Sequence, residues 1–393
     1  MNRRAYLAAG ASAAALVAGC SLGDTEGDRT CSVDPERNPG TAGWPTATGD
    51  WRNTRSVPRA GMPEPPLSIQ WTHAVGGHIG IPAPTVADGT VYTTNMDTTL
   101  YAVGAEEGRT RWSARMAGPG LPVVAGDALA VGVDDSHLRG VGRADGDDRW
   151  MAGLPAGDRF PYRRPAVAAE SVLAPTELGL VAFDPTTGEV RWRYRTGLST
   201  ARHPAVADGT VYVGGADAYV HAVDAATGDR RWWTKTATAA ETPVAAAHGA
   251  VYAGTADGTV VALDGATGEV RWRGEVDDRP ERLAVDGGHV YVGTGGGLFA
   301  LRADSGERCW RYDGFSPGYA GGLAASPDRI FATDTGSDGD IPGTIVALDP
   351  ASGEVAWRFA GAADRLTSGP AVVDGALYVG GVAEATLSLI KLA

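Results

Sequence analysis

Tryptophans recur along most of this chain at intervals of about forty residues. The series consists of Trp71, Trp112, Trp150, Trp192, Trp232, Trp272, Trp310 and Trp357. A glycine stands four positions before each of the last seven. A repeat of about 20 to 50 residues is typical of architectures that copy one supersecondary unit. We therefore expect a series of similar units, in which these eight tryptophans are structural docking residues between neighbours.

The tryptophans follow a recurring turn phrase. Residues 262–272 read ALDGATGEVRW, residues 222–232 read AVDAATGDRRW, and residues 182–192 read AFDPTTGEVRW. An alternating apolar run before the turn and a second run after it predict an antiparallel hairpin. The glycine supplies a positive φ, and the aspartate eight positions before the tryptophan is suited to accept hydrogen bonds from the loop backbone.

A second hairpin lies earlier in each unit, where Asp-Gly separates two apolar strands, as in residues 87–93 and 207–213. Each unit is therefore expected to contain four short strands. Such units without helical patterns between them predict a β-propeller. Seven units lie between residues 82 and 357, and an eighth requires residues 67–71 to join the C-terminal segment. The predicted fold is all-β: an eight-bladed propeller of four-stranded antiparallel blades, closed by the N- and C-terminal strands.

The first residues have the features of an export signal. Arg3 and Arg4 precede an apolar run that ends in LVAGC at Cys20. The run is too short to span a bilayer comfortably. The arginine pair resembles a twin-arginine signal, and the residues before Cys20 resemble a lipobox, in which the cysteine is lipidated after cleavage. We expect a signal peptide at residues 1–19 and a lipid anchor on the outer face of the cell membrane; the alternative is an ordinary signal with a chance cysteine.

Residues 20–66 are expected to be a flexible tether between that anchor and the propeller, residues 67–393, because most of this segment has few apolar side chains. Its second half contains Trp44 and Trp51, which are expected to dock on the propeller. Cys31 and Cys309 are the two cysteines that follow Cys20. They can pair outside the cell, but their positions alone do not establish a disulfide.

The charge of the chain restricts its partners. The formal net charge is -13 at pH 7, and an acidic surface of this kind repels nucleic acid. Lysine occurs only at Lys235 and Lys391. This acidic, lysine-poor composition favours a halophilic, haloarchaeal source. We expect a monomer that contacts membrane only through its lipid anchor.

The turn phrases resemble the repeat of the PQQ-like (pyrroloquinoline quinone) β-propellers, a family that includes quinoprotein dehydrogenases and cofactor-free BamB-type lipoproteins. The resemblance covers residues 67–393, weakening where Gly104, Gly142 or Arg302 replaces the turn aspartate. The dehydrogenases hold calcium with Glu, Asn and Asp side chains and stack adjacent cysteines on the quinone. Asparagine is scarce in this chain, and no two of its cysteines are adjacent. The resemblance therefore implies the scaffold without a cofactor, with a PQQ- and calcium-dependent dehydrogenase as the alternative.

Other candidate sites are weaker. Asp334, Asp338 and Asp340 form an acidic loop that could hold calcium, but the EF-hand spacing is absent and a solvated loop is the alternative. A carbohydrate-binding module is a further alternative, for which four connector aromatics are available: Phe160, Tyr162, Phe315 and Tyr319.

Aligning the innermost strands places a group of cations on the connectors at one mouth of the central channel. The group consists of Arg163, Arg164, Arg202, His203 and Arg282. Guanidinium groups bind carboxylates and phosphates, so this group is a candidate site for an anionic ligand or an acidic protein partner; the alternative is pairing with Asp158, Glu241, Glu281 or solvent ions. The sequence thus favours a non-catalytic, lipid-anchored extracytoplasmic propeller that acts as a protein- or ligand-binding scaffold.

Overall fold

The structure is a computed structural model that describes most of the repeat region and parts of the segment before it. The described residues are 31–34, 46, 49–50, 52–58, 62–76, 83–95, 98–118, 120–160, 165–168, 171–197, 203–240, 242–313, 322–334, 343–383 and 386–393. Arg3, Arg4, Cys20, Trp44 and Trp51 lie outside them. No helix long and apolar enough to cross a membrane occurs in these ranges.

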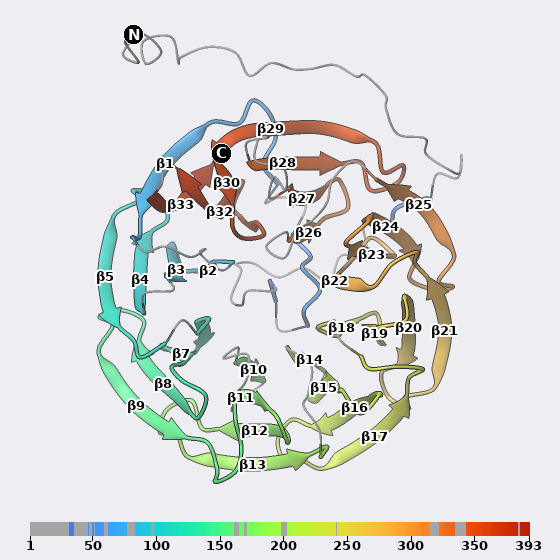
Figure 1. The fold of residues 1–393 in the computed structure, drawn as a ribbon, viewed down its shortest axis with the longest axis horizontal. Helices are drawn as coiled ribbons and strands as arrows, with labels where there is room; N and C mark the ends of the chain where they lie inside the picture. The colour runs from blue at the N-terminus through green and yellow to red at the C-terminus, as the bar shows by residue number, and fades with distance from the viewer. Residues whose placement is uncertain are drawn as a thin grey trace.

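Eight antiparallel sheets stand radially around a common centre (Figure 1), which confirms the predicted eight-bladed propeller. Blade 1 contains β2 (Thr85–Ala87), β3 (Thr90–Thr94), β4 (Thr99–Gly104) and β5 (Thr110–Arg115). Blade 2 contains β6 (Val123–Ala125), β7 (Ala128–Gly132), β8 (His137–Gly142) and β9 (Asp148–Gly153). Blade 3 contains β10 (Ala166–Ala168), β11 (Ser171–Thr176), β12 (Gly179–Phe183) and β13 (Val190–Arg195). Blade 4 contains β14 (Ala205–Ala207), β15 (Thr210–Gly214), β16 (Tyr219–Asp224) and β17 (Arg230–Lys235).

The second half of the ring repeats this order. Blade 5 contains β18 (Ala245–Ala247), β19 (Ala250–Gly254), β20 (Thr259–Asp264) and β21 (Val270–Glu275). Blade 6 contains β22 (Pro280–Asp286), β23 (His289–Thr294), β24 (Gly297–Arg302) and β25 (Arg308–Tyr312). Blade 7 contains β26 (Leu323–Ala325), β27 (Ile330–Asp334), β28 (Gly343–Leu348) and β29 (Val355–Ala363).

Blade 8 is built from both ends of the described chain. It contains β31 (Ala371–Val373), β32 (Ala376–Ala383), β33 (Thr386–Leu392) and β1 (Ile69–Ala74), with the short β30 (Arg365–Leu366) also paired to β32. The antiparallel pairing of β1 with β33 runs from Ile69 opposite Leu392 to Ala74 opposite Ser388. The predicted closure of the ring by the terminal strands is therefore confirmed.

Each repeat tryptophan lies on an outermost strand and packs against the next blade. Seven indole Nε1 atoms donate a hydrogen bond of 2.7–3.1 Å to a turn carbonyl of the following blade. Trp232, for example, donates to the Gly265 carbonyl oxygen at 2.9 Å. Gly268 lies beneath the same ring. Its φ is +77 degrees, and the equivalent glycines of the other turns also have positive φ. A Cβ at Gly268 would lie 2.6 Å from the indole. Both conditions require glycine at this position.

Trp357 is the exception, and its position explains why. Its Nε1 is buried without a hydrogen-bond partner among the described residues. The next blade is blade 8, whose two outer strands, β33 and β1, are not consecutive in sequence. No turn phrase therefore joins these two strands. Closing the ring with the two termini therefore removes the eighth acceptor.

The alanine of the turn phrase also has a packing role. Ala222 is the register partner of Trp232, and Ala262 is the partner of Trp272. In blade 2 the same position is Gly140, where a Cβ would lie 2.2 Å from the Trp150 ring. A small residue opposite each tryptophan lets the indole lie flat against its own sheet.

We expect Trp232→Ala to lower the free energy of unfolding by about 3–5 kcal/mol, because it empties a buried aromatic site and removes the bond to Gly265. The neighbouring Trp233 is 53% exposed, and it contacts Arg230 at the surface. Trp233→Ala is therefore the matched control and should cost less than about 1 kcal/mol. Guanidinium denaturation followed by circular dichroism measures both, and equal losses would contradict this role for Trp232.

Candidate functional site at the centre of the ring

The structure describes two of the five cations predicted at the channel mouth. Arg163, Arg164 and Arg202 lie outside the described residues, so their grouping is not visible. His203 is 2% exposed. Arg282 is one-fifth exposed at its side chain, and its Nη1 lies 4.0 Å from the Glu281 carboxylate. Of the two described residues, His203 is therefore buried, and Arg282 lies beside Glu281, one of the acids named above as its possible partners.

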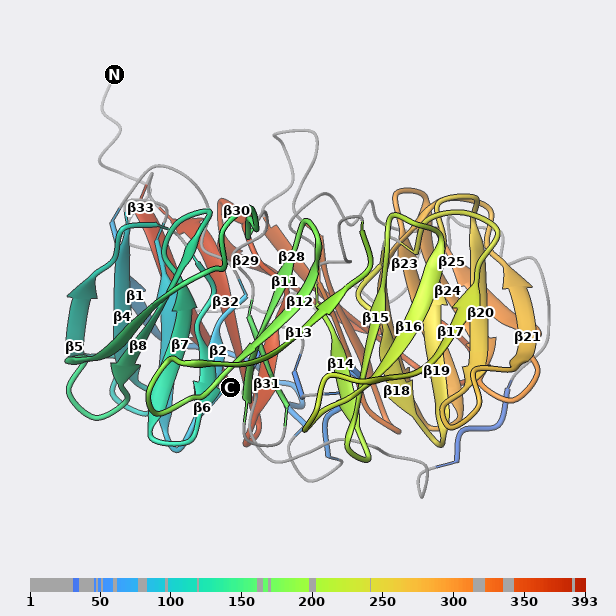
Figure 2. The same cartoon turned by 90° about the horizontal axis from the view of Figure 1, so that it is seen from below.

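Residues 50 and 52–58, which we call the strap, lie inside the ring of innermost strands (Figure 1). The strap bonds to three successive blades through its backbone. Ala246 N donates to the Arg52 carbonyl oxygen at 2.9 Å, and Val285 N donates to the Thr54 carbonyl oxygen at 2.8 Å. Ser56 forms a parallel bridge with Ala325. Seen from the edge, the dark blue N-terminal segments follow one side of the ring (Figure 2).

Side chains of the strap add further bonds. Asn53 is 4% exposed and its amide nitrogen donates to the carbonyl oxygens of Val244 at 2.9 Å and His203 at 3.3 Å. Ser56 donates its hydroxyl to Asp286 Oδ2 at 2.7 Å. Within the strap, Asp50 accepts bonds from the Thr54 backbone and hydroxyl. These described residues of the range expected to be a tether are ordered against the propeller, because hydrogen bonds replace the apolar contacts that their composition lacks.

A disulfide fixes the chain upstream of the strap. Cys31 is bonded to Cys309 on β25, with their Cα atoms 5.7 Å apart and a sequence separation of 278. Both residues are 3% exposed. The pairing that the sequence left open is therefore present, and it joins the N-terminal segment to blade 6.

Blade 6 departs from the repeat at the two positions closest to this attachment. The last residue of the innermost strand is alanine or valine in the other blades, but it is Asp286 in blade 6. Its register partner on the second strand is His289, where other blades have Thr, Ala, Ser or Ile. Comparing blades position by position is the sequence signal that would have found these two residues.

Burial controls the ionisation of both. Asp286 is fully buried, and loss of solvation raises its pKa to about 7 despite the hydrogen bond from Ser56. Its second oxygen has no partner among the described residues. Burial also lowers the pKa of His289, and the nearby Arg302 charge adds to that effect. At neutral pH blade 6 therefore presents a partly protonated carboxyl and a neutral imidazole to the interior.

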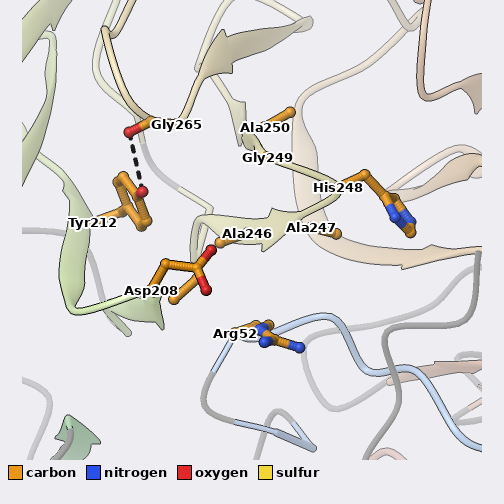
Figure 3. A pocket seen from close by; sticks show the side chains of 10 residues that line it. Arg52, Asp208, Tyr212, Ala246, Ala247, His248, Gly249, Ala250 and Gly265 are labelled. Carbon is orange, nitrogen blue, oxygen red and sulfur yellow. Dashed lines mark hydrogen bonds between the residues drawn. The ribbon is translucent and has the colours of Figure 1, made fainter.

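A cavity of about 230 Å³ lies where the strap crosses blades 4 and 5. Arg52 of the strap, Asp208 of the β14–β15 turn and His248 of the β18–β19 turn line it (Figure 3). Tyr212 donates its hydroxyl to the Gly265 carbonyl oxygen at 3.0 Å beside it. The opposed charges of Arg52 and Asp208 suit a small polar group. The sequence did not indicate this cavity, because Arg52 reaches it from a segment expected to be mobile.

Two further predicted sites give limited information. Asp334 ends β27, whereas Asp338 and Asp340 lie outside the described residues. The proposed calcium loop therefore remains a prediction. Phe160 is fully buried, which removes it from the aromatics expected to be exposed for carbohydrate. Tyr162, Phe315 and Tyr319 lie outside the described ranges.

Comparison with known families assigns the chain. It matches the family described as outer membrane protein assembly factor BamB over residues 51–201 and 177–320, which is more than half of its length. The chain belongs to this family.

Individual relatives of this BamB-family chain are distant. BamB from Moraxella catarrhalis superimposes with a TM-score of 0.67 at 18% identity, covering 83% of this chain and 99% of that one. Quinohemoprotein alcohol dehydrogenase from Comamonas testosteroni gives 0.69 at 15% identity, covering 92% and 82%. The serine/threonine-protein kinase AfsK of Streptomyces griseus is 35% identical over 148 residues, which is 34% of this chain and 18% of the kinase. The structural likenesses show the shared propeller fold, which occurs in both BamB and a dehydrogenase.

The described residues do not fit the quinone and calcium of the dehydrogenases. Both described asparagines have structural bonds: Asn53 holds the strap, and Asn95 binds the Val75 carbonyl and the Thr99 amide. The two described cysteines are bonded to each other and are far apart in sequence. Among these residues, the group of three possible metal ligands is Cys31, His289 and Cys309, which lacks the oxygen ligands that calcium prefers.

We expect Asp286→Asn to change how stability depends on pH. The unfolded carboxyl ionises near 3.8 and the folded one near 7, so this group binds more protons in the folded state between these values, and its contribution to wild-type stability falls as pH rises through them. The difference between wild type and the variant should change by at most about 4 kcal/mol over this window.

Urea denaturation at pH 4 and pH 8 tests this expectation, with the asparagine keeping an acceptor for Ser56. Subtracting the variant removes the opposing contribution of His289, whose lowered pKa costs stability at low pH. Parallel pH profiles for the two proteins would show that Asp286 ionises normally.

Proposed function

We propose that this BamB-family protein is a lipid-anchored, extracytoplasmic propeller that acts without catalysis as a protein- or ligand-binding scaffold. The family match supports a binding role, because its description names an assembly factor. A rigid ring suits that role, since the blades fix the positions of connectors that differ from blade to blade. The proposal concerns this mode of action and not the particular assembly in which other members act.

The strap is the observation that carries the proposal. It bonds to β18, β22 and β26 at the centre of the ring, through backbone and buried side chains. Polar groups that would otherwise be available to a cofactor there are used to hold the chain's own N-terminal segment. A rigid, internally tied core with variable connectors is better suited to recognition than to turnover.

The anchor proposal predicts that Cys20→Ser releases the exported protein from membranes. Loss of the acyl chains removes the hydrophobic anchor, and no other membrane attachment is proposed. Fractionation of cells expressing each protein, with immunoblotting of membrane and soluble fractions, measures the effect. Cys31→Ser is the matched control and should remain with the membrane. Retention of the Cys20→Ser protein in the membrane fraction would rule out the lipid anchor.

The non-catalytic role predicts no response to PQQ with calcium. We expect tryptophan fluorescence of the purified protein to stay unchanged on titration, and dye-linked oxidation of alcohols and sugars to remain at background, because the described residues lack a matching donor set. A quinoprotein dehydrogenase assayed in parallel verifies the reagents. Saturable binding accompanied by turnover would identify this protein as a dehydrogenase instead.

A further inference from the structure

The junction between the N-terminal segment and blade 6 brings three metal-ligating side chains together. The Sγ atoms of Cys31 and Cys309 and a ring nitrogen of His289 all lie within 4.8 Å of one another. The three residues are 3%, 3% and 1% exposed. They come from the N-terminal segment, β25 and β23, so the fold assembles them from distant parts of the sequence.

His289 is the unusual member of the group. Neither of its ring nitrogens makes a hydrogen bond of normal geometry with the described residues, the nearby Gly287 backbone included, although a buried polar group is normally paired. The imidazole occupies a position where other blades have smaller side chains that cannot ligate in this way. Its neighbour Tyr291, with the ring centroid 5.9 Å away, also has an unpartnered buried hydroxyl. The buried polar atoms of His289 and Tyr291 thus lack the hydrogen bonds that such atoms normally make among the described residues.

By contrast, the equally buried His221 on β16 has hydrogen-bond partners for both ring nitrogens. His221 is also 1% exposed, and its two nitrogens lie 2.9 Å from Asp217 Oδ2 and 2.9 Å from the Tyr194 hydroxyl. The fold therefore can satisfy a buried imidazole with hydrogen bonds. His289 instead lies beside the sulfur atoms of Cys31 and Cys309.

We propose that, when the Cys31–Cys309 disulfide is reduced, Cys31, Cys309 and His289 bind one zinc ion. Thiolate and imidazole are the ligands that Zn²⁺ favours in proteins, at about 2.3 Å and about 2.0 Å respectively. Two thiolates at the first of these distances on a tetrahedral ion are separated by roughly 3.8 Å, so the two sulfurs must move apart by about 1.7 Å from their spacing in the disulfide. A water would take the fourth position of the tetrahedral ion.

The two states interconvert by balanced steps. A trialkylphosphine and one water reduce the S–S bond: phosphorus is oxidised to the phosphine oxide, and each sulfur takes one proton. Zn²⁺ then displaces both thiol protons to solvent, forming two Zn–S bonds and one Zn–N bond with the neutral imidazole. The N-terminal segment stays tied to blade 6 in either state, by a covalent bond or by the ion.

The segment has freedom to make the required shift. Its described backbone bonds to the body near this point are Cys31 N to the Ala351 carbonyl oxygen at 3.1 Å and Asp34 N to the Gly287 carbonyl oxygen at 3.0 Å. No strand of the propeller includes Cys31. Separation of the two sulfurs therefore moves a connecting segment and leaves the blades in place.

Cobalt substitution tests the proposal on the full chain. The protein is reduced with tris(2-carboxyethyl)phosphine, stripped with a chelator and titrated with Co²⁺. We expect one equivalent to produce thiolate-to-cobalt charge-transfer absorption, and one equivalent of Zn²⁺ to abolish it. The disulfide form should give no such band. Absence of the band in the reduced protein, or the same band in the oxidised protein, would overturn the proposal.

Variants separate a ligand role from a structural one. His289→Asn should weaken Zn²⁺ binding to the reduced protein by more than about tenfold, measured by competition with a chromophoric chelator. The matched control His221→Asn removes an equally buried imidazole and should leave the affinity unchanged. Equal affinities in the two variants would exclude His289 as a ligand.

The melting temperature of the wild-type protein tests the zinc site even if a variant does not fold. The reduced protein should melt at a higher temperature with Zn²⁺ than without it, because the ion binds the folded state. The oxidised protein should melt at the same temperature in both conditions. A reduced protein whose melting is indifferent to Zn²⁺ would contradict the site.

Discussion

The hydrogen bond from a tryptophan indole to the turn of the next blade is the interaction on which the ring depends. A single four-stranded blade has two faces to cover, and seven of the eight repeat tryptophans cover one of them while bonding across the gap, as Trp232 does with Gly265. The turn glycine allows this approach because it has positive φ and no Cβ. Opposite the indole, a small residue such as Ala222 leaves room for the ring. One turn phrase therefore specifies both a hairpin and a contact between blades.

The same interaction shows the consequence of closing a ring with chain ends. Trp357 faces blade 8, which has no turn phrase, and its indole nitrogen is left without a partner among the described residues. Closure instead depends on backbone pairing between β1 and β33. The strap supplies further ties inside the ring at blades 5, 6 and 7. The N-terminal segment thus holds the propeller at its centre as well as at its closing blade.

The fold could be predicted because the same turn phrase and tryptophan recur in most blades. The contacts of the N-terminal segment at the centre of the ring could not be predicted. Strand pairing by the strap uses backbone groups, which every residue carries, so composition does not indicate which residues bond to the centre of the ring. Cysteine positions do not reveal pairing, and nothing in the sequence spacing of Cys31 and Cys309 indicates that the fold brings them together. Asp286 and His289 were visible in principle as departures from the repeat. Recognising them requires aligning the first two strands of all eight blades position by position.

Departures from the repeat converge on blade 6. Its innermost strand has seven residues where the corresponding strands of the other blades have three, and its turn uses two glycines of positive φ, Gly287 and Gly288. Beside that turn lie Asp286, which accepts a bond from the strap, and the ligand group of the disulfide. A repeat fold conserves packing in every blade, so polar residues that break the repeat at buried positions answer a local need. In this protein the need is the attachment of the N-terminal segment, which the disulfide and the strap tie to blade 6.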